Sequence, residues 1–220
     1  MEDRVTPGLY LEMSSVPPAE YVDTRLPEVL DLPGVEAASW WENAHPDRND
    51  LPRKLDEFSL LSVFEVNEDF KAPPAPAWVG RLDFRRYPRP GQGIITGRPT
   101  VGLLLVLIGP RSASGAQALR DWADFVHIRH IAECGVPGYC MITPYENATG
   151  GYPRFMHFYE MDTDDPETAF KMMPSMVEAR LGGGPGNPSF DRWASHPELQ
   201  IVYVNTFRRL GGSSRRAKTK

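Results

Sequence analysis

The chain has 220 residues, of which 41% are hydrophobic and 24% are charged, and its formal net charge is -5. A chain of this size and composition can bury a hydrophobic core without disulfides or structural metal ions. Its negative charge argues against nucleic acid as a partner, because phosphate binding requires a basic surface. The longest apolar run, residues 101–108, is too short to cross a bilayer, so no membrane association is expected.

The first half of the sequence predicts one helix among four strands. The strands are expected at residues 9–14, 36–42, 58–66 and 78–87. The helix is expected at 19–30, where Pro27 should distort or interrupt it. The polar segment 43–56 predicts a loop. Residues 87–93, YPRPGQG, are typical of a loop or linker and lack the spacing of a nucleotide-binding glycine motif.

The second half predicts two helices among four strands. The strands are expected at residues 101–108, 139–145, 154–161 and 199–210. The first helix should begin near Ser112 or Ser114, either of which can act as the N-cap, and should end before Gly135. The second helix should begin at Asp165, with a proline and a glutamate in its first turn. Residues 182–188 are expected to form a flexible insertion.

Three short motifs occur in the same order in both halves. They are an apolar-Pro-Gly turn at 32–34 and 136–138, an aromatic-Glu pair at 64–65 and 159–160, and a Phe-Arg-Arg triplet at 84–86 and 207–209. This repeat predicts an α+β protein made of two ferredoxin-like units. Because each unit carries helices on one side of its sheet only, the two uncovered faces can pack together. The expected result is an intramolecular α/β barrel with antiparallel sheets around a central cavity.

The predicted boundaries follow from this repeat. The N-terminal repeat spans residues 1–90 and has a reduced second helix, a linker spans 91–100, and the C-terminal repeat spans 101–211. Residues 212–220 are basic and lack a hydrophobic cluster, so they predict a disordered tail.

Cysteine usage indicates the cellular compartment. Cys134 and Cys140 do not form a C-x-x-C pair, and their spacing indicates no disulfide framework, as in a reducing cytoplasm. The polar first residues, MEDRVTPG, do not resemble a secretory leader. We therefore expect a cytoplasmic protein.

The segment from Phe125 to Tyr139, FVHIRHIAECGVPGY, resembles the EthD-like branch of the dimeric α/β barrel superfamily. That branch often reads W-Y-D-x-E-H-[IL]-P-E, followed by a P-G-F step into the next strand. His130 falls on the family histidine, His127 replaces the usual acid, and Arg25 stands where the first half would carry its histidine. The resemblance implies the barrel fold. It does not select one reaction, because the superfamily includes cofactor-free monooxygenases, polyketide cyclases, lactone isomerases and haem enzymes.

The two histidines of this helix are the first candidates for catalysis. His130 and His127 lie three residues apart on one helix face, and histidine suits proton transfer because its unperturbed pKa is near neutrality. We expect His130 to point toward the barrel cavity and to exchange a proton with the substrate. In the alternative interpretation, both side chains lie at the edge of the apolar stripe and bind backbone groups of a loop. No metal site is predicted, because no Asp, Glu or Cys at a matching spacing completes a ligand set.

Strand residues are candidates for the catalytic partner of His130. His157 and Tyr159 lie on the same face of their strand, and they act as an acid/base pair if this face lines the cavity. If this face is turned toward the helices, Met156 and Phe158 line the cavity instead.

Glu12 is the third candidate partner, because it lies in an otherwise apolar strand where a carboxylate is costly to bury alone. It either faces a polar cavity, which we favour, or pairs with Arg25. The candidates for substrate binding are an arginine that can hold an anionic group, a histidine and four aromatic residues, although aromatic residues in strands more often belong to the core. These candidates are Arg25, His127, Tyr10, Trp40, Trp41 and Tyr145.

These features predict a small enzyme that binds a hydrophobic, aromatic or polyketide-like substrate in the barrel cavity and needs no cofactor. The expected chemistry is proton abstraction next to a carbonyl or phenol, followed by cyclisation, isomerisation, dehydration or C–C cleavage. One alternative is a cofactor-free monooxygenase, in which the same base generates a substrate carbanion. Another is a non-catalytic small-molecule binding module, which the loss of the histidine from the first half favours. A homodimer of the fused pair is a further option.

Overall fold

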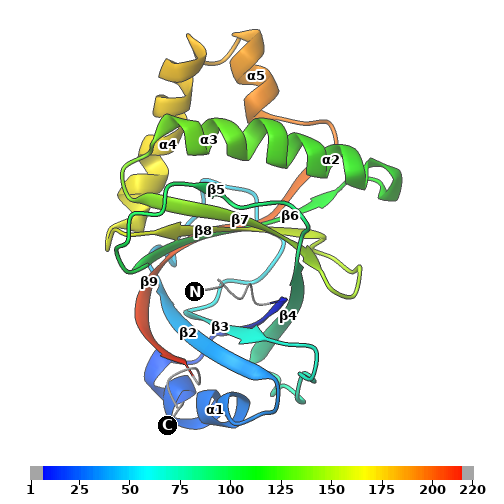
Figure 1. Cartoon of the computed structure of the whole chain (residues 1–220), viewed down its shortest axis with the longest axis vertical. Coiled ribbons are helices and arrows are strands. Elements are labelled where there is room, and N and C mark those ends of the chain that lie inside the picture. The colour runs from blue at the N-terminus through cyan, green and yellow to red at the C-terminus, as the bar shows by residue number, and fades with distance from the viewer. Residues whose placement is uncertain (1–6, 215–220) are drawn as a thin grey trace.

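Eight strands close into an antiparallel barrel in the part of the chain that the computed structural model describes, residues 7–214 (Figure 1). The strands are β1 Gly8–Ser14, β2 Val35–Asn43, β3 Leu60–Val66, β4 Val79–Arg86, β6 Gly102–Pro110, β7 Tyr139–Asn147, β8 Phe155–Met161 and β9 Leu199–Ser214. Their order is β4-β1-β3-β2-β9-β6-β8-β7, and β4 also pairs with β7. A short strand, β5 Gln92–Gly93, lies beside β7. The predicted α+β class with an antiparallel barrel is confirmed.

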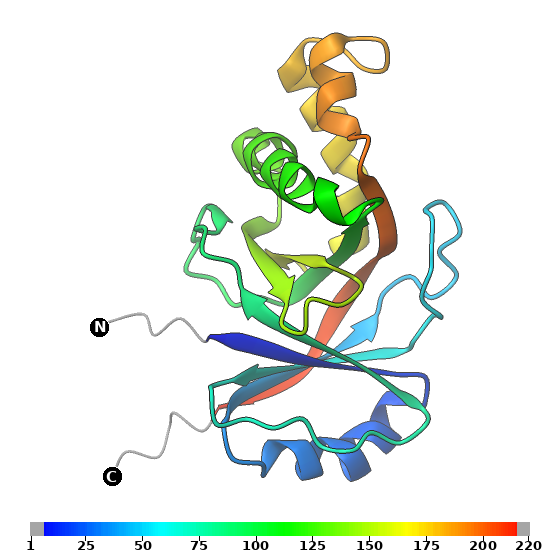
Figure 2. The ribbon, with the colours of Figure 1, turned by 90° about the vertical axis from the view of Figure 1, so that its right-hand side faces the viewer.

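The two halves of the chain meet along two seams of the barrel, which Figure 2 shows from the side. In one seam β2 pairs with β9, and in the other β4 pairs with β7. The first half has the order strand, helix, strand, strand, strand. The second half has the same order with two further helices before its last strand. The helices are α1 Pro18–Leu30, α2 Ala116–Trp122, α3 Ile128–Cys134, α4 Pro166–Leu181 and α5 Pro188–Ala194.

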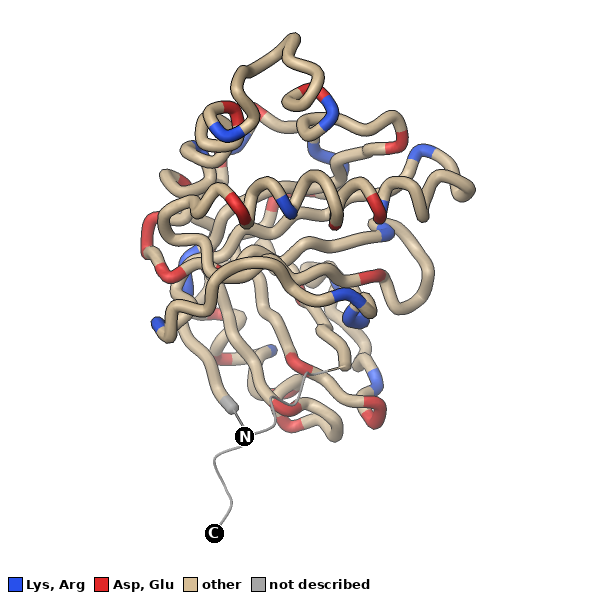
Figure 3. Tube along the Cα trace, turned by 45° about the horizontal axis from the view of Figure 1, so that its top comes forward, with Lys and Arg blue, Asp and Glu red and all other residues tan. Residues whose placement is uncertain are grey.

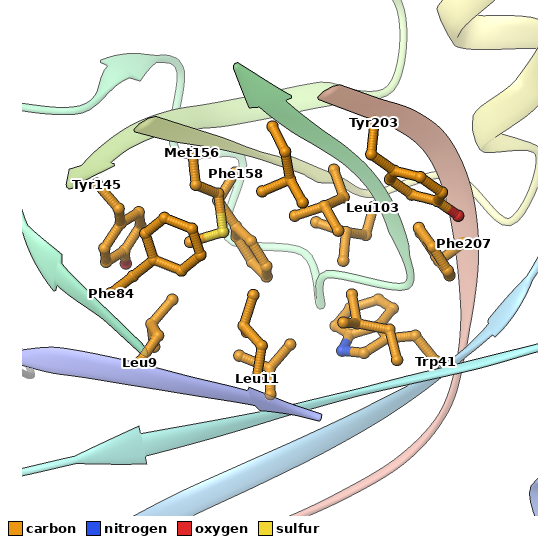
Figure 4. Packing of buried hydrophobic residues seen from close by; sticks show 14 of the residues in the cluster. Leu9, Leu11, Trp41, Phe84, Leu103, Tyr145, Met156, Phe158, Tyr203 and Phe207 are labelled. Atoms are coloured by element: carbon orange, nitrogen blue, oxygen red, sulfur yellow. The ribbon is translucent and has the colours of Figure 1, made fainter. Parts of the chain in front are cut away.

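The centre of the barrel is filled by hydrophobic side chains. Alternate residues of each strand point inward, so that Leu9 and Leu11 of β1 lie opposite Met156 and Phe158 of β8 (Figure 4). Trp41 and Tyr145, two predicted substrate contacts, belong to this same core. They do not line an open site. The space that was expected to be a substrate cavity is occupied at these positions by packed side chains.

The helices lie outside the barrel (Figure 1). Between α2 and α3 the chain forms one π-helical segment, η2 Ala123–His127, so that a single long helix contains a short stretch of wider turn. Ser112 precedes this helix and accepts a hydrogen bond from the Gly115 N–H (3.1 Å), as predicted for an N-cap. Gly135 ends it in the left-handed conformation, with φ 64°.

Pro27 lies inside α1 and does not interrupt it, so of the two predicted outcomes, distortion or interruption, the second does not occur. The proline removes its own N–H donor and crowds the carbonyl one turn earlier, but the next turn still forms, with Asp31 N–H donating to the Pro27 carbonyl at 3.1 Å.

Two predicted boundaries were wrong. The segment 182–188 leads into the short helix α5, whose N-cap Asn187 accepts hydrogen bonds from the N–H groups of Ser189 (2.9 Å) and Phe190 (3.4 Å). Strand β9 continues through residues 212–214 because it pairs with β2, where Ala37 lies opposite Ser214. The predicted disordered tail therefore begins too early, and its remaining residues, 215–220, lie outside the described part of the chain. Such long-range pairing cannot be read from local composition.

Charged residues of both signs are interspersed along the trace (Figure 3). On α3, for example, Arg129 Nε donates to Glu133 Oε1 at 2.8 Å, a pairing one helical turn apart. No helix among residues 7–214 is both long and apolar enough to span a membrane.

Candidate functional site

A mostly apolar cavity of about 220 Å³ lies outside the barrel, between the sheet and the helices of the second half. Its walls come from β6, β8 and β9 on one side and from α2, η2 and α4 on the other. His127, His157 and Tyr159 are the predicted site residues that line it. An apolar cavity of about 150 Å³ can hold benzene, so this one has room for a somewhat larger aromatic molecule.

His157 and Tyr159 reach this cavity because their face of β8 is turned toward the helices. Met156 and Phe158 alternate with them and point into the barrel core. Of the two orientations left open by the sequence, the one that turns His157 toward the helices is therefore correct. His157 is only 2% exposed.

A buried arginine approaches the His157 ring. Arg120 Nη1 lies 3.4 Å from His157 Nε2, and Arg120 Nη2 donates to the carbonyl oxygen of Tyr145 at 2.6 Å. A guanidinium group can only donate, so the ring nitrogen that faces it uses its lone pair. This contact places the His157 proton on Nδ1. The Arg120 guanidinium is held between the rings of Tyr87 (4.2 Å) and Phe155 (4.0 Å).

A buried aspartate balances the charge of Arg120. Asp124 lies one turn further along the helix, with Oδ1 3.4 Å from Arg120 Nη1 and 3.8 Å from His157 Nε2. Arg89, from the segment after β4, donates to Asp124 Oδ2 at 2.9 Å. Burial raises the pKa of the Asp124 carboxyl, and the two arginines lower it. Positive and negative groups thus alternate from Arg89 through Asp124 to Arg120, which contacts His157.

His127 is fixed in orientation by two tryptophans. Its ring stacks on Trp193 at 5.2 Å with an interplanar angle of 8°, and Trp122 lies on another side at 5.1 Å. His127 Nδ1 donates to the carbonyl oxygen of Trp193 at 3.0 Å, and Trp193 Nε1 donates to the carbonyl oxygen of His127 at 3.1 Å. Because a carbonyl only accepts, the His127 proton is on Nδ1 and the lone pair is on Nε2. The predicted contact with backbone is thus present, although its partner lies in helix α5 and not in a loop, and the ring lines the cavity as well.

Both cavity histidines are held neutral. Burial lowers the pKa of His157 well below its usual value, and Arg120 and His127 lower it further. Burial also lowers the pKa of His127, against the opposing effect of the Trp193 carbonyl. A neutral imidazole can accept a proton at one nitrogen and donate at the other.

We expect the free energy of unfolding to decrease as the pH falls below about 6.5, the usual pKa of histidine. In this range the unfolded chain binds protons at His127 and His157 that the folded protein does not bind. Each of the two contributes at most about 1.4 kcal/mol per pH unit. Urea unfolding at about pH 7.5 and about pH 5.5 measures the decrease, which His157→Gln should make smaller. An equal pH dependence in the wild type and the variant would contradict this expectation.

His130 does not lie where it was predicted. It belongs to α3, outside the barrel, and it is not among the residues that line the cavity. Its side chain is 29% exposed, with Nδ1 4.0 Å from Glu133 Oε2. The prediction that it points into the barrel was wrong because the helices pack on the opposite face of the sheet from the barrel interior.

Glu12 and Arg25 form a closed cluster under α1, on the other side of the barrel. Arg25 Nη2 lies 2.7 Å from Glu12 Oε1, and the hydroxyl groups of Tyr10 and Tyr21 each donate to the Glu12 carboxylate at 2.7 Å. Glu12 is 0% exposed and Arg25 5%. The favoured prediction that Glu12 faces a polar cavity was wrong, and Arg25 is already paired with Glu12 and Glu28 instead of being available for an anionic substrate.

Trp40, the remaining predicted contact, also packs on the α1 side of the barrel. The candidate residues other than His130 therefore separate into three groups: those at the cavity, those in the barrel core and those under α1.

Arg120 and Asp124 are the site residues that sequence reasoning missed. An arginine and an aspartate four residues apart, between the apolar residues Leu119 and Ile128, are the local signal. Two opposite charges on the apolar side of a helix indicate a buried pair. The π-helical segment that carries Asp124 and His127 is a second indication, since such segments occur frequently at functional sites.

The barrel, with helices outside it and a cavity between sheet and helices, defines the class: the chain has the fold of the dimeric α/β barrel proteins, formed within a single chain. No protein-family model matches the sequence, and no curated protein matches it.

Solved structures with this fold include an anthrone oxidase-like protein, with 13% sequence identity and a TM-score of 0.58, where the match covers 98% of this chain and 96% of that one. A protein from Lactobacillus acidophilus named as a candidate monooxygenase has 10% identity and a TM-score of 0.54, with 96% and 97% covered. A major regulator of staphylococcal pathogenesis has 8% identity and a TM-score of 0.52, with 91% and 98% covered. At these identities the similarity establishes the fold.

Proposed function

We propose that the protein is an enzyme that removes a proton from a hydrophobic, aromatic or polyketide-like molecule bound in the cavity between sheet and helices. The observation that carries this proposal is the presence of two neutral histidines in one apolar cavity that use different ring nitrogens for their protein contacts. Both carry the proton on Nδ1. His127 uses this N–H for Trp193 and keeps the Nε2 lone pair, whereas His157 uses its Nε2 lone pair for Arg120 and keeps the Nδ1–H.

In this proposal His127 is the general base. Its Nδ1–H bond to Trp193 holds the ring, and the lowered pKa keeps Nε2 unprotonated at neutral pH. A C–H next to a carbonyl, or a phenol O–H, transfers its proton to Nε2. The aromatic walls exclude water, which strengthens the electrostatic interactions inside the cavity.

His157 supports the negative charge that develops on the substrate oxygen. Its Nδ1–H donates a hydrogen bond, and the guanidinium of Arg120 polarises the ring from the other nitrogen. Tyr159 is a second donor on the same strand face. Asp124 keeps Arg120 in place, and no step in this sequence requires a cofactor.

The test is hydrogen exchange of 2-tetralone, an aromatic ketone with acidic protons next to its carbonyl. Incubation of the protein with 2-tetralone in D₂O should accelerate the loss of these proton signals in the NMR spectrum above the rate in buffer. Failure of 2-tetralone to bind, or binding without accelerated exchange at pD values around neutrality, would contradict the proposal.

A monooxygenase that uses dioxygen without a cofactor is the second candidate function. It is favoured because the structures with this fold include an anthrone oxidase-like protein and a candidate monooxygenase. The first step is the same, since removal of a proton generates the carbanion that then reacts with dioxygen. An oxygen electrode separates the two: consumption of dioxygen during turnover of a two-ring ketone such as 2-tetralone supports the monooxygenase, and turnover without it supports isomerisation, cyclisation, dehydration or cleavage.

A further inference from the structure

The loop between β2 and β3 extends from the first half of the chain to the cavity of the second half. Among the described residues that line this cavity, only Leu51 comes from before residue 104. Leu51 is partly buried and packs against the hydrophobic cluster between the sheet and the helices of the second half. We refer to residues 44–57 as the strap. The first half, whose own helix covers a closed ion-pair cluster, thus supplies one wall of the cavity.

Backbone hydrogen bonds hold the strap on β9. Ala44 N–H donates to the carbonyl oxygen of Thr206 at 2.9 Å, and Lys54 N–H donates to that of Val202 at 2.8 Å. Strand β2 ends where Asn43 lies opposite Phe207, so the strap occupies the position next to β9 that β2 has left. Leu51 lies between the two attachment points.

A buried arginine fixes the middle of the strap. Arg48 is 4% exposed, and its Nε donates to Asn205 Oδ1 at 3.0 Å. Its guanidinium group pairs with Glu167 in the first turn of α4 and lies 4.9 Å from the centre of the Phe170 ring. Phe170 is itself a wall of the cavity. A charge-assisted anchor of this kind makes the strap a fixed wall rather than a freely moving lid.

The far end of the strap is also tied to β9. Glu57 accepts a hydrogen bond from the Tyr203 hydroxyl at 2.5 Å and forms an ion pair with Arg53 at 2.8 Å. Leu51 is therefore carried by a segment that is anchored before it and after it.

We propose that Leu51 determines the size of the ligand that the cavity accepts. The inference rests on the proposed function, because it takes this cavity as the substrate site. Leu51 lines a cavity whose volume, about 220 Å³, suits one or two fused aromatic rings. A third ring has to displace the Leu51 side chain, which the anchored strap opposes. Shortening this side chain creates room, and enlarging it removes room.

The experiment is isothermal titration calorimetry with phenol, 2-naphthol and 9-phenanthrol, which contain one, two and three rings. Leu51→Ala should bind 9-phenanthrol at least about tenfold more tightly than the wild type does. Leu51→Phe should bind 2-naphthol at least about tenfold more weakly, with the affinity for phenol changed by less than about threefold.

Leu55→Ala is the matched control. Leu55 lies on the same strap and is partly buried, but it packs against the barrel core instead of the cavity. The same loss of volume there should leave the order of affinities unchanged. Equal effects of the two alanine variants, or changes at Leu51 that do not depend on ligand size, would overturn the assignment of Leu51 alone. Failure of all three compounds to bind the wild-type protein would overturn the proposed function together with this inference.

Discussion

Replacing His127 with glutamine should reduce the rate of hydrogen exchange from 2-tetralone by at least about 100-fold, the lower end of what a general base contributes. Glutamine can retain a hydrogen bond to the Trp193 carbonyl through its amide N–H, so the local packing is preserved. An amide, however, has no lone pair that is basic enough to accept the proton. NMR spectra recorded in D₂O measure the exchange rate, and titration of 2-naphthol shows whether the cavity still binds.

The same substitution at His130 is the control. His130 lies on the same helix and differs by three positions, but it does not line the cavity. His130→Gln should therefore change the exchange rate by less than about threefold, which is under 1 kcal/mol. If His130→Gln abolishes exchange and His127→Gln does not, the general base is the residue selected by the family resemblance, and the assignment to the cavity is wrong.

Replacing Glu12 with glutamine should lower the free energy of unfolding by about 3–5 kcal/mol. The Glu12 carboxylate is fully buried and is the counter-ion of Arg25, which has only 5% of its surface exposed. Glutamine keeps the shape but removes the negative charge, so a buried cation is left without sufficient compensation. A loss of this size is a large fraction of the 5–15 kcal/mol that is typical of a folded protein, and urea unfolding measures it.

Glu28 provides a matched position for this experiment, because it pairs with the same arginine. Arg25 Nη1 lies 3.0 Å from Glu28 Oε2, but Glu28 is 65% exposed. Exposed ion pairs contribute about 0–1 kcal/mol, so Glu28→Gln should have a small effect. Similar losses in the two variants would show that burial does not decide the strength of the Glu12 pair.

The positions of strands and helices could be predicted from the sequence because their signals are local. Hydrophobic runs located the strands, and the caps at Ser112 and Gly135 marked the two ends of a long helix. The face of each strand that points into the barrel was harder to predict from the sequence. In β8, His157 and Met156 point in opposite directions, and the alternation of residues alone does not tell which direction is the barrel interior.

The main error concerned the location of the cavity. A ferredoxin-like unit has its helices on one face of the sheet, so a helix residue such as His127 meets the outer face and not the barrel interior. Applying this rule consistently would have placed the cavity between helix and sheet. The second arginine that pairs with Asp124 could not be predicted for another reason, because Arg89 is 35 residues away in sequence and only the folded loop brings it near.

Because the barrel is closed, each half of the chain depends on the other for the pairing of its edge strands. Each half ends in strands whose backbone donors and acceptors are used by the other half, through β2 with β9 and β4 with β7. Separating the halves would expose two rows of unpaired backbone groups at once, and such edges promote association with other chains. Neither half therefore pairs both of its edge strands without the other half.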